Sequence, residues 1–190
     1  QETCVLALAL LGRIPHEDCS SLVVSALIRC LFAPHVFIRA LVCAETIQLA
    51  VYRRCTTFQL FAQHLHIVCH VAIHASRGMM HALSDIARLV NMPGPTFLQA
   101  TLGYTLPLLL ERMALGQATA QAEMEAMAAT VGQSVPAICL AHVSDVFQHA
   151  FLQPSDVRDA SLQMFMSLLG SKSVTISNLL RSRLHDVLGW

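Results

Sequence analysis

The densest group of possible metal ligands is a run of four histidines and one cysteine within residues 63–74. Histidine and cysteine are common zinc ligands, and two histidines four residues apart on a helix can share one ion. On a helical projection His66, His70 and His74 lie in one arc beside the apolar face. His66 and His74 are separated by about 12 Å along the axis, whereas a zinc–nitrogen bond is about 2.1 Å. One ion therefore cannot reach all three rings, and we interpret them as a polar face.

Further ligands are missing near this run. Residues 53–82 contain no Asp or Glu, and the H-E-x-x-H pattern of zinc proteases is absent. Cys69 falls away from the histidine arc on the projection. The sequence therefore predicts no metal site, and a small metalloprotein that uses His66 and His70 is kept as an alternative hypothesis. Whether the three histidines face solvent or a neighbouring helix stays open.

The sequence also lacks the short motifs of common enzyme classes. The glycine-rich phosphate-binding loops, the G-x-S-x-G nucleophile turn and the H-R-D and D-F-G motifs of protein kinases are all absent. Asp156 and Asp159 follow Pro154 at the expected start of a helix, where the helix dipole favours negative charge. We predict no catalytic residue and no cofactor-binding residue in this segment.

The chain of 190 residues is unusually apolar and carries no net formal charge. Its charged fraction is 13% and its mean hydropathy is +0.56, whereas a typical soluble domain is about 25% charged. No uninterrupted apolar run of about 18 residues occurs, so no membrane span is predicted. The arginines are scattered without a basic stripe, which argues against direct nucleic-acid binding. We interpret the apolar composition as that of a piece of a larger protein, whose neighbouring parts cover both sides of its helices.

The N-terminus and the cysteines fit this interpretation. Gln1 is no initiator methionine, and residues 2–11 are typical of a helix already under way, so we expect a fragment of a much larger chain. The seven cysteines are odd in number and show no C-x-x-C spacing. They predict small buried thiols in a reducing compartment and not a disulfide framework.

Proline, glycine and capping residues divide the sequence into nine or ten expected helices with short connections. Thr96 and Ser134 are expected to cap two of them, and Pro107 is expected to kink the helix that contains it. The fold class is therefore all-α, and a helix-pair period of about 35–45 residues fits a HEAT-like α-solenoid of antiparallel pairs. The expected helices cover residues 2–11, 18–32, 34–51, 57–75, 80–90, 97–115, 117–131, 134–152, 154–169 and 175–188.

Residues 90–110 resemble part of the UME domain of ATR-type checkpoint kinases, which belong to the phosphatidylinositol-3-kinase-related serine/threonine protein kinases. A looser similarity covers residues 64–188, so residues 61–190 are expected to form a UME-like helical domain. Residues 1–60 are expected to form a further HEAT-like helical segment. The family motif consists of Met92, Pro93, Phe97, Leu98, Thr101, Leu102, Leu106 and Pro107.

This resemblance implies a non-catalytic scaffold segment of a nuclear kinase that acts in the DNA-damage and replication-stress checkpoint. The segment would mediate protein–protein contacts, with an ATRIP-like subunit and with the rest of the solenoid, and would relay conformation to a distant kinase domain. ATP and Mg²⁺ would bind only to that kinase domain, which lies outside this sequence. The motif residues carry over as structural positions, because the catalytic motifs of the family are absent here. The alternative is a stand-alone helical-repeat adaptor, unrelated to kinases, that binds a partner helix in a groove.

Overall fold

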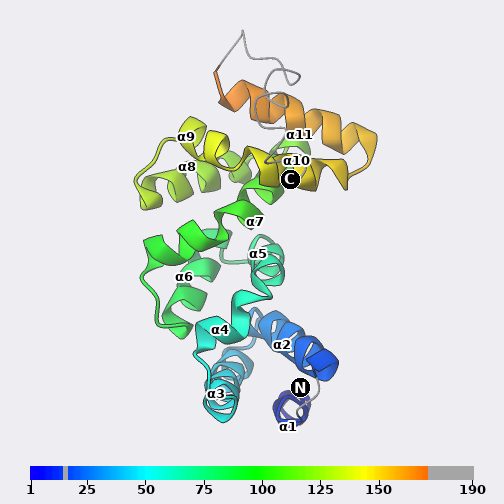
Figure 1. Ribbon diagram of the computed structural model, residues 1–190, viewed down its shortest axis with the longest axis vertical. Coiled ribbons are helices and arrows are strands. Elements are labelled where there is room, and N and C mark those ends of the chain that lie inside the picture. Colours follow the sequence, from blue (N-terminus) through cyan, green and yellow to red (C-terminus); the bar gives the residue numbers. More distant parts are fainter. Residues whose placement is uncertain (15–16, 171–190) are drawn as a thin grey trace. The chain divides into compact units, whose positions relative to one another are not determined.

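The computed structural model describes residues 1–14 and 17–170, and all of their regular secondary structure is α-helical (Figure 1). The chain divides into two compact units, which we call the N-terminal unit (Gln1–Phe97) and the C-terminal unit (Leu98–Trp190). The N-terminal unit contains α1 (Glu2–Leu11), α2 (Glu17–Leu31), α3 (Val36–Tyr52), α4 (Thr57–Ala62), α5 (Leu65–Ala72) and α6 (Met79–Leu89). The boundary between the units falls within α7 (Gly94–Ala114), which is followed by α8 (Thr119–Val131), α9 (Val135–Ala141), α10 (Val143–Phe151) and α11 (Ser155–Leu168).

The predicted all-α class is confirmed for the described residues, which already contain eleven helices instead of nine or ten. The excess arises because the helices expected over residues 57–75 and 134–152 are each divided in two. The first is interrupted at Gln63–His64 and the second at His142. Neither point carries a proline or glycine, so no breaker residue marks the interruption. The helix expected over residues 175–188 lies outside the described residues.

One of the two predicted caps is confirmed and the other is wrong. The Ser134 hydroxyl accepts a hydrogen bond from the Ala137 N–H at 3.4 Å and begins α9. Thr96 is no cap, because α7 already begins at Gly94 and the Phe97 N–H donates to the Pro93 carbonyl at 2.9 Å. Pro95 therefore lies in the first turn of α7, where its missing N–H costs no hydrogen bond.

In the N-terminal unit, α3 packs against both α1 and α2, and α5 packs against α2 and α6. The ends of α1 and α3 are joined by Arg53, which donates through Nε, at 3.1 Å, and through Nη2 to the Gly12 carbonyl. A Cβ atom on Gly12 would lie 3.0 Å from Val23 Cγ1 and 3.1 Å from Leu49 Cδ2. Glycine at this position thus allows α1 to end close against α2 and α3.

In the C-terminal unit, Phe147 of α10 meets Phe165 of α11 edge to face, with ring centroids 6.2 Å apart. The end of α7 is tied to α8 by an ion pair between Arg112 and Glu123 at 2.8 Å. The buried Thr105 hydroxyl donates to the Thr101 carbonyl one turn earlier at 3.0 Å. Phe147 and Phe165 are completely buried in this core, whose other buried side chains are mostly aliphatic.

The Thr46→Val substitution in α3 is expected to raise the free energy of unfolding by about 1 kcal/mol. The Thr46 hydroxyl is fully buried and has no hydrogen-bond partner in the described part of the chain. Valine keeps the shape and removes this unsatisfied polar group. Urea unfolding followed by circular dichroism measures the change.

The matched control is Thr105→Val, because the Thr105 hydroxyl is equally buried but donates a hydrogen bond. This second substitution is expected to give no gain in stability. Equal gains at both positions, or no gain at Thr46, would show that hydrogen bonding of the hydroxyl does not decide the outcome.

Candidate functional site

The three histidines of the expected polar face lie at exposed positions, with His66 and His70 on α5 and His74 just beyond its end. The His70 and His74 rings meet edge to face, with their centroids 5.4 Å apart. His64 is different, because its side chain is buried and burial lowers the pKa of its imidazole. Among the described residues, no group of three or more His, Cys, Asp or Glu side chains is arranged to hold a metal ion. His66, His70 and His74 therefore face solvent and not a neighbouring helix of the described residues.

The eight motif residues lie along α7 or in the turn before it. Met92 is half-buried and Pro93 is exposed in that turn, whereas the other six side chains are buried. The Thr101 hydroxyl donates to the Leu98 carbonyl at 3.0 Å. The buried motif residues are Phe97, Leu98, Thr101, Leu102, Leu106 and Pro107. Most of the motif is thus in contact with protein and not with solvent.

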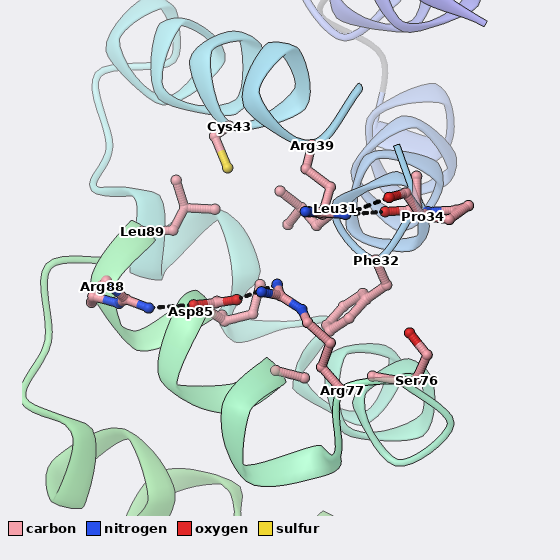
Figure 2. A pocket seen from close by; sticks show the side chains of 14 residues that line it. Leu31, Phe32, Pro34, Arg39, Cys43, Ser76, Arg77, Asp85, Arg88 and Leu89 are labelled. Atoms are coloured by element: carbon pink, nitrogen blue, oxygen red, sulfur yellow. Dashed lines mark hydrogen bonds and ion pairs between the residues drawn. The ribbon is translucent and has the colours of Figure 1, made fainter. Parts of the chain in front are cut away.

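A cavity of about 700 Å³ lies entirely within the N-terminal unit (Figure 2). Its walls come from the end of α2 and the loop after it, from α3, from the turn between α5 and α6, and from α6. Leu31 and Ile86 give it a buried apolar wall, which half-buried Phe32 and Leu89 extend. The volume is in the range of ordinary ligand pockets, about 300–1,000 Å³.

Arg39 is the best-positioned polar group of this cavity. Its Nη1 donates to the Ala33 and Pro34 carbonyls, at 2.8 Å each, just past the end of α2 (Figure 2). A cation is favourable there, because its charge strengthens the hydrogen bonds to these two loop carbonyl oxygens. No hydrogen bond within the described residues uses Arg39 Nε or Nη2. The guanidinium group is thus fixed at one end and has donors left for a ligand.

A second charged group lies at the rim of the cavity. Asp85 on α6 accepts a hydrogen bond from Arg77 Nη2 at 2.8 Å and another from Arg88 Nη2 (Figure 2). Both arginine side chains are largely exposed, so these ion pairs contribute only about 0–1 kcal/mol each to stability. Counting Arg39, the cavity lining carries three arginines and one carboxylate, so its charged side chains sum to about +2.

The Cys43 thiol lines the same cavity and lies within electrostatic reach of Asp85 and Arg39. Burial raises the pKa of Cys43, the Asp85 carboxylate raises it further, and the Arg39 guanidinium lowers it in part. The thiol therefore stays protonated at neutral pH and is a poor nucleophile. The cavity combines an apolar wall with excess positive charge, which suits the binding of an anionic, partly apolar group.

Sequence reasoning missed this cavity. The pair Asp85 and Arg88 could have been recognised from its i,i+3 spacing on α6. Nothing local indicated that residues 31–43 and residues 75–89 would enclose one space. The packing of α2 with α5 and of α5 with α6 brings these two stretches together.

Comparisons of the chain with protein-family models, with curated proteins and with solved structures give no match. Within the described residues, no helix has both the length and the apolar character needed to span a bilayer.

Proposed function

We propose that this chain is a non-catalytic scaffold segment of an ATR-type serine/threonine protein kinase of the DNA-damage and replication-stress checkpoint. In this proposal it belongs to a HEAT-like α-solenoid of a nuclear protein. It holds protein partners, including an ATRIP-like subunit, and relays conformation to a kinase domain elsewhere in the parent chain. The observation that carries the proposal is the motif of residues 92–107, whose members from Phe97 onward are buried along α7. Burial suits residues that specify a structural domain and not a catalytic surface.

The surface of α1 supports the scaffold role. This helix is apolar on nearly all sides, yet only Val5 and Ala9 are buried. Leu6, Leu10 and Leu11 are exposed, Leu10 to 61%. A helix that is apolar all round is normally covered by other protein. In the proposed parent protein, neighbouring helices of the solenoid cover this face.

The most direct test is to sequence the complete transcript that encodes these residues. We expect an open reading frame that continues into a kinase domain of the phosphatidylinositol-3-kinase-related type. A stop codon soon after the codon for Trp190, without kinase motifs, would overturn the kinase assignment and favour the stand-alone adaptor. Purification of the tagged full-length protein from nuclei, followed by mass spectrometry, then tests for an ATRIP-like partner.

The exposed leucines of α1 lead to a prediction about self-association. Without those neighbouring helices, the isolated 190-residue chain is expected to self-associate through the α1 face, and replacing Leu6 and Leu10 together with glutamine is expected to weaken this association by about tenfold or more. Burying one leucine side chain stabilises a contact by about 1.5–3 kcal/mol, so the loss of two is readily measured. Size-exclusion chromatography with light scattering over a concentration series gives the association constant.

The matched control is Leu152→Gln, because Leu152 is 84% exposed but lies just after α10, outside α1. It is expected to leave the association constant unchanged. An equal effect of both changes would mean that general surface hydrophobicity, and not the α1 face, drives self-association.

A further inference from the structure

We propose that the cavity of the N-terminal unit is a docking site for an acidic, partly apolar segment of a partner protein. In this site a bulky apolar side chain of the partner inserts against Leu31 and Ile86, and a neighbouring carboxylate pairs with Arg39. The inference rests on the proposed role in protein–protein contact, but it does not depend on the kinase resemblance. The docking site can therefore be absent although the transcript encodes a kinase domain, and it can be present although the transcript does not.

The apolar lining favours a large apolar side chain as the group that the partner inserts. Leu31 and Ile86 are buried, and Phe32 and Leu89 border the same space, so these four lining residues offer no hydrogen-bonding side chain. A polar group placed there would lose its bonds to water without replacement. Leucine, isoleucine, methionine or phenylalanine of a partner segment would gain by burial in about 700 Å³ of space.

The arginines of the lining favour an acidic residue beside the inserted apolar side chain of the partner. Arg39 is held at Nη1 by the Ala33 and Pro34 carbonyls, so little side-chain freedom is lost when its other donors bind a ligand. The planar guanidinium group matches the two oxygens of a carboxylate, and such charge-assisted pairs are stronger than neutral hydrogen bonds. Asp85 neutralises only one of the two rim arginines, and an acidic partner compensates the remaining positive charge.

The apolar surroundings argue for a carboxylate ligand over a phosphate. Asp85 lies among the cavity-lining residues and is partly exposed, so it weakens the attraction of the arginines for any anion. The remaining attraction grows in proportion to the charge of the ligand, whereas the cost of removing its water grows with the square of that charge, so a phosphate dianion loses more than a carboxylate beside the apolar lining. Nucleic acid is disfavoured as well, because sequence-independent binding to its backbone needs an extended array of cationic contacts.

The test selects short random peptides, displayed on phage, against the intact 190-residue chain. We expect the selected sequences to be enriched in Asp or Glu next to a large apolar residue. Three peptides are then synthesised, and their binding is measured by fluorescence anisotropy. They are the best acidic peptide, a neutral twin with Gln in place of Glu and Asn in place of Asp, and a twin with phosphoserine in place of the acidic residue. The neutral twin is expected to bind about tenfold more weakly or worse, because its amide oxygen replaces the ion pair with Arg39 by a weaker hydrogen bond to a neutral acceptor.

Location is tested by alkylation of the thiols. Cys43 lines the cavity, whereas Cys55 does not, and both are half-buried. The acidic peptide is expected to slow alkylation of Cys43 and to leave Cys55 unchanged, as read by mass spectrometry. Failure to select acidic–apolar sequences, equal protection of both thiols, or tighter binding of the phosphoserine twin would each overturn the proposal.

Variants complete the experiment. Arg39→Met is expected to abolish the preference for the acidic peptide over its neutral twin. Since this change also removes hydrogen bonds at the end of α2, a second variant places a carboxylate at exposed Ser76 on the rim. Ser76→Glu is expected to weaken acidic-peptide binding roughly fivefold, whereas Gln48→Glu, an equal charge change on α3 outside the cavity, is not. Equal effects of the two Glu variants would contradict binding in this cavity.

Discussion

Replacing Phe147 with alanine is expected to lower the free energy of unfolding of the C-terminal unit by about 3–5 kcal/mol. The Phe147 side chain on α10 is completely buried, so its removal leaves a cavity in the core. The substitution also removes the edge-to-face contact with Phe165, and such pairs contribute about 0.5–1.5 kcal/mol beyond burial. Urea unfolding followed by circular dichroism measures the loss. Most small domains are stable by only about 5–15 kcal/mol, so this change removes a large share.

The matched control is Phe151→Ala, one turn further along α10. The Phe151 ring stacks on Phe147 with centroids 6.2 Å apart, but its side chain is 56% exposed. We expect a loss of about 1 kcal/mol or less at this position, because little new cavity forms. Similar losses at Phe147 and Phe151 would mean that the core does not lie between α10 and α11.

Alkaline pH is expected to destabilise the fold through two buried thiols, Cys69 and Cys139. Burial raises the pKa of Cys69 to about 12 and that of Cys139 to about 11, from an ordinary value of 9.0. In the unfolded chain the thiols ionise near pH 9.0, whereas in the folded protein they keep their protons up to the raised values. Stability is therefore complete below pH 9.0 and falls as the pH rises, by about 1.4 kcal/mol per pH unit for each thiol. The total is smaller for Cys139, since its pKa is raised less.

Urea unfolding at a series of pH values from about 8 to about 11 tests this dependence. The control is the double variant Cys69→Ala and Cys139→Ala, which keeps all other titrating groups. Its stability is expected to fall less steeply over the same range, although alanine itself costs some packing at neutral pH. Parallel pH profiles of the two proteins would show that the buried thiols do not cause the alkaline loss. The single variants separate the two units, since Cys69 lies in the N-terminal unit and Cys139 in the C-terminal unit.

Local sequence signals predicted the helices well where those signals were strong. Gly12, Gly78 and Gly132 lie at helix boundaries, as expected from their position between apolar periodic segments. Ser134 begins α9 through its hydroxyl, and the following Pro136 fits the first turn. Thr96 misled the prediction, because Gly94 and Pro95 can themselves form the first turn of a helix and leave Thr96 inside it.

The interruptions at Gln63–His64 and His142 could not be predicted from local propensity. Both stretches consist of residues that a continuous helix tolerates, so no sequence signal separates α4 from α5 or α9 from α10. Helical periodicity assumes one straight axis, and a change of axis resets which side chains share a face. His64, buried at the start of α5, still agrees with the projection, which placed it apart from the arc of the other three histidines.

The sequence by itself determined the helical class, most helix boundaries and the placement of three histidines on one helix face, because composition, periodicity and capping act over a few residues. The exposure of that face came from the tertiary structure. The tertiary structure alone decided where the candidate cavity lies and which charges line it. Arg39 follows α2 closely in sequence, whereas Arg77, Asp85 and Arg88 lie more than one helix away. These side chains meet because α2, α5 and α6 pack together. Such long-range packing depends on the fit of whole helix surfaces, which no local pattern encodes.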